Sequence, residues 1–323
     1  MRFLPTDEQL ALAEAIDDIV QSSGGTTIVR AWGSGDPAPG RALWSQLADL
    51  GLMGLCVDES DGGVGGTAVD MVMAFERLGY HAVPGPYIES VALLPDLVQP
   101  GQRETILEGS TIATASVTDL VPLALDAASS DLCFVVDPDQ ISAGRVEGDE
   151  LQSLDRSRKL SHLVATGSPV PLERLTVARA MDRATLASAA MLLGAGERML
   201  EEAVGYAKVR EQFGRAIGEY QALKHALADV RIALSFARPL VHAAALDLGD
   251  EIGARSVSAA KVATGDAATL AVRASLQVLG AVGYTEEHDL SLWITRTRAL
   301  VAAWGSPAVH RARIARLLLD PES

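Results

Sequence analysis

The sequence is short of several residue types, and each shortage excludes a class of protein. Basic residues number 27 against 42 acidic ones, which leaves a formal charge of −15. Nucleic acids and anionic membranes bind to basic faces, so neither is an expected partner. Only two cysteines occur, Cys56 and Cys133, far apart and outside any CxxC pattern, so we expect neither a disulfide framework nor a metal site. No uninterrupted apolar run reaches the roughly 18 residues that would cross a membrane.

Aromatic residues are also scarce, at 4%, whereas apolar residues make up 48% of the 323 positions. Alanine and leucine are abundant among them, which favours helices over sheet sandwiches. We therefore expect a mainly α protein, long enough for two or three lobes. Near the start, Thr6 with Gln9 three positions later predicts a capped amphipathic helix rather than a signal peptide, so we expect a cytoplasmic protein.

The spacing of apolar residues divides the chain into three predicted domains. Residues 1–109 form an N-terminal helical domain, with helices at 5–22, from Arg41 onward and at 68–78, and with a surface loop at 22–40 where Gly, Ser and Pro gather. Residues 110–180 form a short β domain, with strands at 111–117, 132–136, 140–146 and 160–166. Residues 181–323 form a helical bundle, with helices at 182–208, 216–248, 251–281, 286–302 and 306–319.

The most informative stretch is 206–229, YAKVREQFGRAIGEYQALKHALAD, where helical spacing stops and then resumes. Two glycines permit a tight turn there, which leaves Arg210, Gln212 and Phe213 at the end of a helix. A guanidinium fork suits a pyrophosphate, and an aromatic ring suits a flat heterocycle. These three residues therefore predict a site for an aromatic ligand that bears phosphate.

A second interpretation of the same residues involves no ligand. Arg210 would pair with Glu202 or Glu211, and Phe213 would belong to the core. Surface charges often merely pair or stay solvated, so the spacing alone leaves both interpretations open.

The same stretch resembles the signature of the acyl-CoA dehydrogenase family, RxQFGxxIGxxQxxxHxxAD. The matching residues are Arg210, Gln212, Phe213, Gly214, Ile217, Gly218, Gln221, His225, Ala228 and Asp229. A second run, QVLGAVGYTEEHDL at 277–290, resembles the family's Q-x-x-G-G-x-G-Y segment, and LGLMGLCVDESDGGVGG at 50–66 resembles its LGLxGLxVPExxGGxG segment. The resemblance implies that family's fold: an N-terminal helical lobe, a middle β domain that is reduced here, and a C-terminal four-helix bundle.

In that family the two motifs hold FAD, often the FAD of a neighbouring subunit. The resemblance thus implies an FAD site, and the implied cofactor-binding residues are Arg210, Gln212, Phe213, Gln221, Gln277, Gly280 and Ala281. Ala281 stands where the family usually has a glycine, so the backbone approaches the cofactor less easily at that point.

The sequence departs from the family where the chemistry takes place. The TExxxGSD and W-[IV]-[ST]-N segments, which hold the flavin ring and the acyl-CoA in family members, are both absent. The glutamate that removes the α-proton is replaced by Trp304, and the earlier position that a minority of members use falls at about Ala184. Glu286 and Glu287 remain as weak candidates for the base, although acidic residues there also stabilise the start of a following helix.

The motifs that hold the ADP end of FAD are retained, whereas the catalytic glutamate is lost. This combination suggests a complex of two unlike subunits. The chain resembles the short, non-catalytic β-type subunit of the α2β2 acyl-CoA dehydrogenases that bacteria use on steroid-CoA thioesters. This implies a homologous catalytic subunit as partner and an acyl-CoA at a shared site. Two alternatives stay open: a homo-oligomeric dehydrogenase with Glu286 or Glu287 as base, and a flavin-free scaffold subunit.

Overall fold

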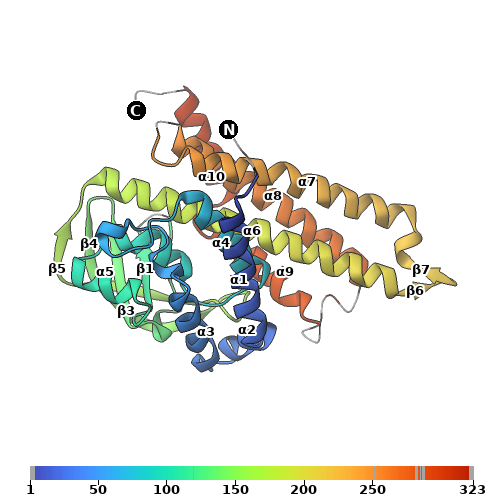
Figure 1. Cartoon of the computed structure of the whole chain (residues 1–323), viewed down its shortest axis with the longest axis horizontal. Helices are drawn as coiled ribbons and strands as arrows, with labels where there is room; N and C mark the ends of the chain where they lie inside the picture. The colour runs from blue at the N-terminus through green and yellow to red at the C-terminus, as the bar shows by residue number, and fades with distance from the viewer. Residues whose placement is uncertain are drawn as a thin grey trace.

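The computed structural model describes residues 4–118, 120–250, 252–280, 283, 285 and 288–319. Figure 1 shows a group of N-terminal helices, a small sheet and a set of long C-terminal helices. The N-terminal group contains α1 (Asp7–Ser22), α2 (Thr26–Gly33), α3 (Ala38–Asp49), α4 (Ala68–Tyr80) and α5 (Pro100–Leu107), with a π-helical turn at Ile88–Leu93. Thr6 caps α1 together with Gln9, as the sequence predicts.

The sheet has five strands in the spatial order β1-β3-β4-β5-β2. Their bounds are β1 Ala113–Val117, β2 Ala124–Leu125, β3 Leu132–Asp137, β4 Gln140–Gln152 and β5 Lys159–Pro171. Strands β1 and β3 are parallel, and the other neighbouring pairs are antiparallel. All residues of β1 are buried, whereas the long β4 and β5 are largely exposed. Both edge strands, β1 and β2, are buried, so other parts of the chain cover the two edges of the sheet.

The long helices are α6 (Arg174–Val209), α7 (Gln221–Leu246), α8 (Gly253–Leu279), α9 (Leu290–Ala302) and α10 (Pro307–Leu319). Helices α6, α7 and α8 pack against one another, α9 packs on α6, and α10 packs on α8. Helix α6 also crosses α4 closely. A Cβ on Gly79 would lie 2.1 Å from the Met191 carbonyl oxygen, and one on Gly194 would lie 1.9 Å from that of Glu76, so both positions need glycine.

Together these elements make the mainly α fold that the sequence predicts, with a reduced sheet and a C-terminal set of packed helices. One prediction in this part of the chain was wrong. Residues 22–40 are not a surface loop, because α2 occupies Thr26–Gly33 and buries Ile28, Val29 and Trp32 in the core. Helix α6 also begins at Arg174, earlier than the predicted start at 182, and β2 was not predicted. Within the described residues, none of the helices is both long and apolar enough to cross a bilayer.

Candidate functional site

A short hairpin between α6 and α7 presents the residues of the first motif. Strands β6 (Glu211–Gln212) and β7 (Arg215–Ala216) form it, and Figure 1 shows it projecting from the end of the helical bundle that lies away from the sheet. At its tip, Phe213 has φ +52° and is 91% exposed. A bulky side chain rarely adopts this backbone conformation or this exposure, and such outliers concentrate at functional sites.

Two contacts expected without a ligand do not form at this hairpin. Phe213 is not part of the core, since its ring is almost entirely in solvent. Glu202 pairs with Arg198 at 2.6 Å, one turn earlier on α6, and not with Arg210. Among the residues that the structure describes, Arg210 is exposed and makes no ion pair. Its guanidinium is therefore free to bind a group from outside the chain.

The second motif lies at the same end of the bundle. Gln277 is exposed in the last turn of α8, and Gly280 follows this helix with φ +59° and no atom within 4 Å of a built Cβ. The ring of His288, beyond the motif, packs edge-on to Tyr206 of α6 with 6.5 Å between ring centroids. This contact places His288 beside the end of α6, close to where the hairpin begins. Ala281, Glu286 and Glu287 lie outside the described residues.

The side chains at this end of the bundle fit one half of a dinucleotide site. Gln212 in β6 and Gln221 at the start of α7 are both exposed and add amide groups to the Arg210 guanidinium. Guanidinium and amide donors suit a pyrophosphate, and the Phe213 ring suits an adenine. All of these groups face solvent.

Trp304 is the residue that the resemblance predicts at the position of the family's catalytic glutamate. Its side chain is fully buried and its φ is +58°. The Trp304 carbonyl accepts a hydrogen bond from His310 Nε2 at 2.8 Å, and a Cβ on Gly305 would lie 2.5 Å from the same nitrogen. Burial is the main cause that lowers the pKa of His310, which favours the neutral ring. The loop at Trp304 and Gly305 is thus tightly packed around an indole, and an indole cannot accept a proton.

Two further buried residues complete the surroundings of this loop. Ala184, at the other position where family members place a base, is fully buried in α6. Lys261 of α8 is 1% exposed and donates hydrogen bonds to Ser188 Oγ and to the Leu300 carbonyl, each at 2.7 Å. Burial, together with the nearby positive charge of Arg158, lowers the pKa of Lys261 to about 7. Neither residue therefore supplies a carboxylate base.

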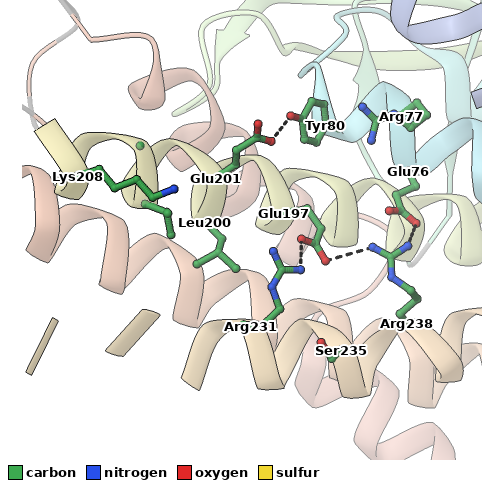
Figure 2. A pocket seen from close by; sticks show the side chains of 12 residues that line it. Glu76, Arg77, Tyr80, Glu197, Leu200, Glu201, Lys208, Arg231, Ser235 and Arg238 are labelled. Carbon is green, nitrogen blue, oxygen red and sulfur yellow. Dashed lines mark hydrogen bonds and ion pairs between the residues drawn. The ribbon is translucent and has the colours of Figure 1, made fainter. Parts of the chain in front are cut away.

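A charged cavity of about 770 Å³, which the sequence did not predict, lies where α4, α6 and α7 meet. Figure 2 shows Arg238 of α7 between Glu76 of α4 and Glu197 of α6, with N–O distances of 2.7 and 3.1 Å. Glu197 also pairs with Arg231 at 2.7 Å. The hydroxyl of Tyr80 donates a hydrogen bond to the carboxylate of Glu201, which also lines the cavity.

This network ties the N-terminal helices to the bundle. Burial is the main cause that raises the pKa of Glu76, and Arg238 opposes it, so removal of the arginine would strand a buried carboxylate. The carboxylates drawn in Figure 2 are satisfied by arginines or by the tyrosine, which indicates a structural role. Within the described residues, no group of His, Cys, Asp and Glu side chains is arranged to hold a metal.

Comparisons with known proteins agree with these observations. Two family models match the chain: "Acyl-CoA dehydrogenase, N-terminal domain" over residues 6–105 and "Acyl-CoA dehydrogenase, C-terminal domain" over residues 167–319. The acyl-CoA dehydrogenase IpdE2 of Mycobacterium tuberculosis is 28% identical over 309 residues, which cover 94% of this chain and 95% of that protein.

Solved structures share the fold. The ChsE4-ChsE5 complex from Mycobacterium tuberculosis matches with a TM-score of 0.86 and 22% identity, over 100% of both chains. The Tcur3481-Tcur3483 steroid ACAD G363A variant matches with a TM-score of 0.85 and 21% identity, over 98% of each chain. At these identities the likeness extends to the fold alone.

Proposed function

The chain belongs to the acyl-CoA dehydrogenase family, and from this premise we propose that it is the non-catalytic subunit of a heteromeric, FAD-dependent acyl-CoA dehydrogenase. In this proposal the chain contributes the ADP end of the FAD site in a cytoplasmic α2β2 complex. A homologous partner contributes the pocket of the flavin ring and the base. The complex removes hydrogens from the α and β carbons of a CoA thioester.

The observation that supports the proposal most strongly is the burial of Trp304. The indole stands at the position of the family's base, is fully buried and has no basic site. The reaction needs a carboxylate within hydrogen-bond reach of the α-proton, and Trp304 does not supply one. A protein that retains the fold and lacks the base is best explained by a partner that supplies it.

Exposed apolar surface on α7 supports a partner chain as well. Ile232, Phe236 and Leu240 follow one another at four-residue spacing and are 52%, 75% and 43% exposed. Residues at this spacing lie on one face of a helix. Helix α7 follows the hairpin that presents Phe213. A partner that docks on this helix therefore lies near the half-site, that is, the proposed FAD-binding residues of the hairpin.

FAD, when bound, supplies the hydride acceptor for the dehydrogenation. The residues of this chain bind and orient it. Arg210 pairs with the pyrophosphate, Phe213 packs on the adenine, and the exposed Gln212, Gln221 and Gln277 donate hydrogen bonds. Gly280 lets the backbone approach closely, because nothing fills the space of its missing Cβ.

The substrate class in the proposal comes from similar proteins. One structural neighbour is titled a steroid ACAD, and another is a complex of two differently named chains. Both have the same fold as this chain at low identity. A steroid-derived acyl-CoA is therefore the first substrate to test, with straight-chain acyl-CoA thioesters as the comparison.

The proposal is tested by dehydrogenase activity with an artificial electron acceptor. We expect the purified chain to be inactive, and a complex with a catalytic partner to be active. Substituting Glu286→Gln and Glu287→Gln together should leave the activity of the complex within about twofold, because in this proposal the partner supplies the base. Substitution of the partner's catalytic glutamate to glutamine should abolish it. Full activity of the chain alone, lost in the Glu286→Gln/Glu287→Gln variant, would instead establish a homo-oligomeric enzyme.

A further inference from the structure

The hairpin that presents Phe213 is too small to be stable by itself. Its strands have two residues each, and its two turn residues, Phe213 and Gly214, have φ +52° and +78°. Positive φ at both turn residues is what a type I′ turn requires, and phenylalanine adopts it at a cost. Isolated two-stranded hairpins are marginally stable in water at best. Contacts with the rest of the chain must therefore hold this hairpin closed.

The base of the hairpin is held against the end of α6. Ile217, which follows β7, is buried, and its backbone N–H donates a hydrogen bond to the Arg210 carbonyl at 2.8 Å. Gly218 comes so close to α6 that a Cβ built on it would lie 2.9 Å from the Ala207 carbonyl oxygen. These contacts fix where the hairpin leaves the bundle, but they lie at its base and not at its tip.

Tyr220, directly before α7, contacts both strands beside the turn. Its hydroxyl donates a hydrogen bond to the Gln212 carbonyl in β6 at 3.3 Å. The guanidinium of Arg215 in β7 lies over its ring, with 4.1 Å between Cζ and the ring centroid. Gln212 and Arg215 are the cross-strand partners that flank Phe213 and Gly214. One half-buried side chain, packed against the core, therefore holds together the residue pair that closes the turn.

We propose that Tyr220 is a positioning residue for the FAD half-site: it keeps the hairpin closed before FAD binds and so fixes where Phe213 lies relative to Arg210. This inference rests on the proposed function. Tyr220 acts through the Gln212 carbonyl and the Arg215 side chain rather than through the cofactor itself. A half-site that is ordered in advance loses less conformational entropy on binding, which raises its affinity.

Chymotrypsin, which cleaves after phenylalanine, tests the closed hairpin in the isolated chain. A protease cleaves a tight turn mainly when the turn opens locally, so the rate of cleavage after Phe213 reports the open population. Tyr220→Phe loses one hydrogen bond and should speed this cleavage about fivefold, and Tyr220→Ala, which also loses the ring, about 20-fold. The Tm of Tyr220→Phe should stay within about 2 °C, since the hairpin opens without the core.

The effect on the cofactor is measured as the dissociation constant of FAD in the complex with a catalytic partner. Tyr220→Phe should raise it about threefold and Tyr220→Ala about tenfold. The matched control is Tyr206→Phe, which removes the hydroxyl of a half-buried tyrosine whose ring packs on His288, and it should change neither measurement. A double variant with Phe213→Ala distinguishes positioning from general support of the fold. Once Phe213 is removed, Tyr220→Ala should cost about twofold or less, because the two effects are coupled.

Faster cleavage after Phe213 in both Tyr220 variants, together with weaker FAD binding, supports the proposal. Unchanged cleavage in Tyr220→Ala overturns it, as do equal losses of FAD affinity from Tyr220→Ala with and without Phe213. Unchanged FAD affinity in Tyr220→Ala overturns the positioning role alone, because the proposed function requires only that the unsubstituted complex binds FAD. An unsubstituted complex without FAD overturns the proposed function and the assignment to FAD with it, whereas the cleavage rates still decide whether Tyr220 closes the hairpin.

Discussion

Arg210→Ala is expected to strip most of the FAD from the heteromeric complex. A bidentate pair between a guanidinium and a phosphate is worth about 1.5–3 kcal/mol, so the dissociation constant of FAD should rise roughly 10- to 100-fold. Because Arg210 is exposed and has no ion pair within the described residues, its removal should leave the fold of the chain intact. Flavin retained after gel filtration, measured by absorbance, reports the loss.

Two further variants distinguish a specific contact between Arg210 and FAD from a general attraction of FAD to positive charge. Lys208→Ala removes an exposed cation two residues earlier on α6, which points to the other side of the helix and should leave flavin content unchanged. Arg210→Lys keeps the charge but loses the planar fork, so it should give an intermediate affinity. If the Arg210→Ala complex keeps its full flavin content, the assignment of an FAD half-site to the hairpin is wrong.

Arg296→Ala should produce the largest loss of stability. Arg296 is 1% exposed and donates to the Asp155 carboxylate, and also to the Val83 carbonyl and to Ser157 Oγ at 2.8 Å each. Although burial opposes it, Arg296 holds the pKa of Asp155 below its ordinary value. Removing the arginine leaves a buried charge unpaired, which costs about 3–5 kcal/mol and should lower Tm on the order of 10 °C.

The control for this prediction is on the same helix. Arg298→Ala removes an exposed arginine of α9 and should change stability by no more than about 0.5 kcal/mol. The double variant Arg296→Met/Asp155→Asn should recover part of the loss, since it removes both charges of the pair. Equal melting of the Arg296→Ala and Arg298→Ala variants would mean that the buried pair contributes nothing to stability.

The sequence predicted the long helices and four of the five strands of the larger sheet because their spacing is regular. It missed α2 because flanking Gly and Ser residues suggested a loop, although Ile28, Val29 and Trp32 already have helical spacing. The glycine Gly25 before this helix, with φ +55°, allows the chain to turn sharply from α1 into α2. The local composition of such a segment does not reveal that a buried face follows.

Buried charged residues were the other feature that the sequence did not predict. Arg296 is a core residue paired with Asp155, 141 positions away, and nothing in the local sequence distinguishes it from the exposed Arg298 on the same helix. Glu89 and Arg158 meet only because the π-helical turn packs beside the sheet. Motif positions are local, so their exposure at one end of the bundle could be anticipated. Pairings between distant elements depend on the complete fold.

The central claim is that this chain supplies half of a shared FAD site, and flavin stoichiometry tests it most directly. FAD should be measured by absorbance per chain for the protein purified alone and again after coexpression with a candidate catalytic partner. A pocket completed by two chains binds ligand only when both are present. We therefore predict almost no flavin in the isolated chain and about one FAD per pair of unlike chains in the complex. One FAD per chain in the isolated protein would contradict the account, as would a complex whose flavin content is unaffected by Arg210→Ala.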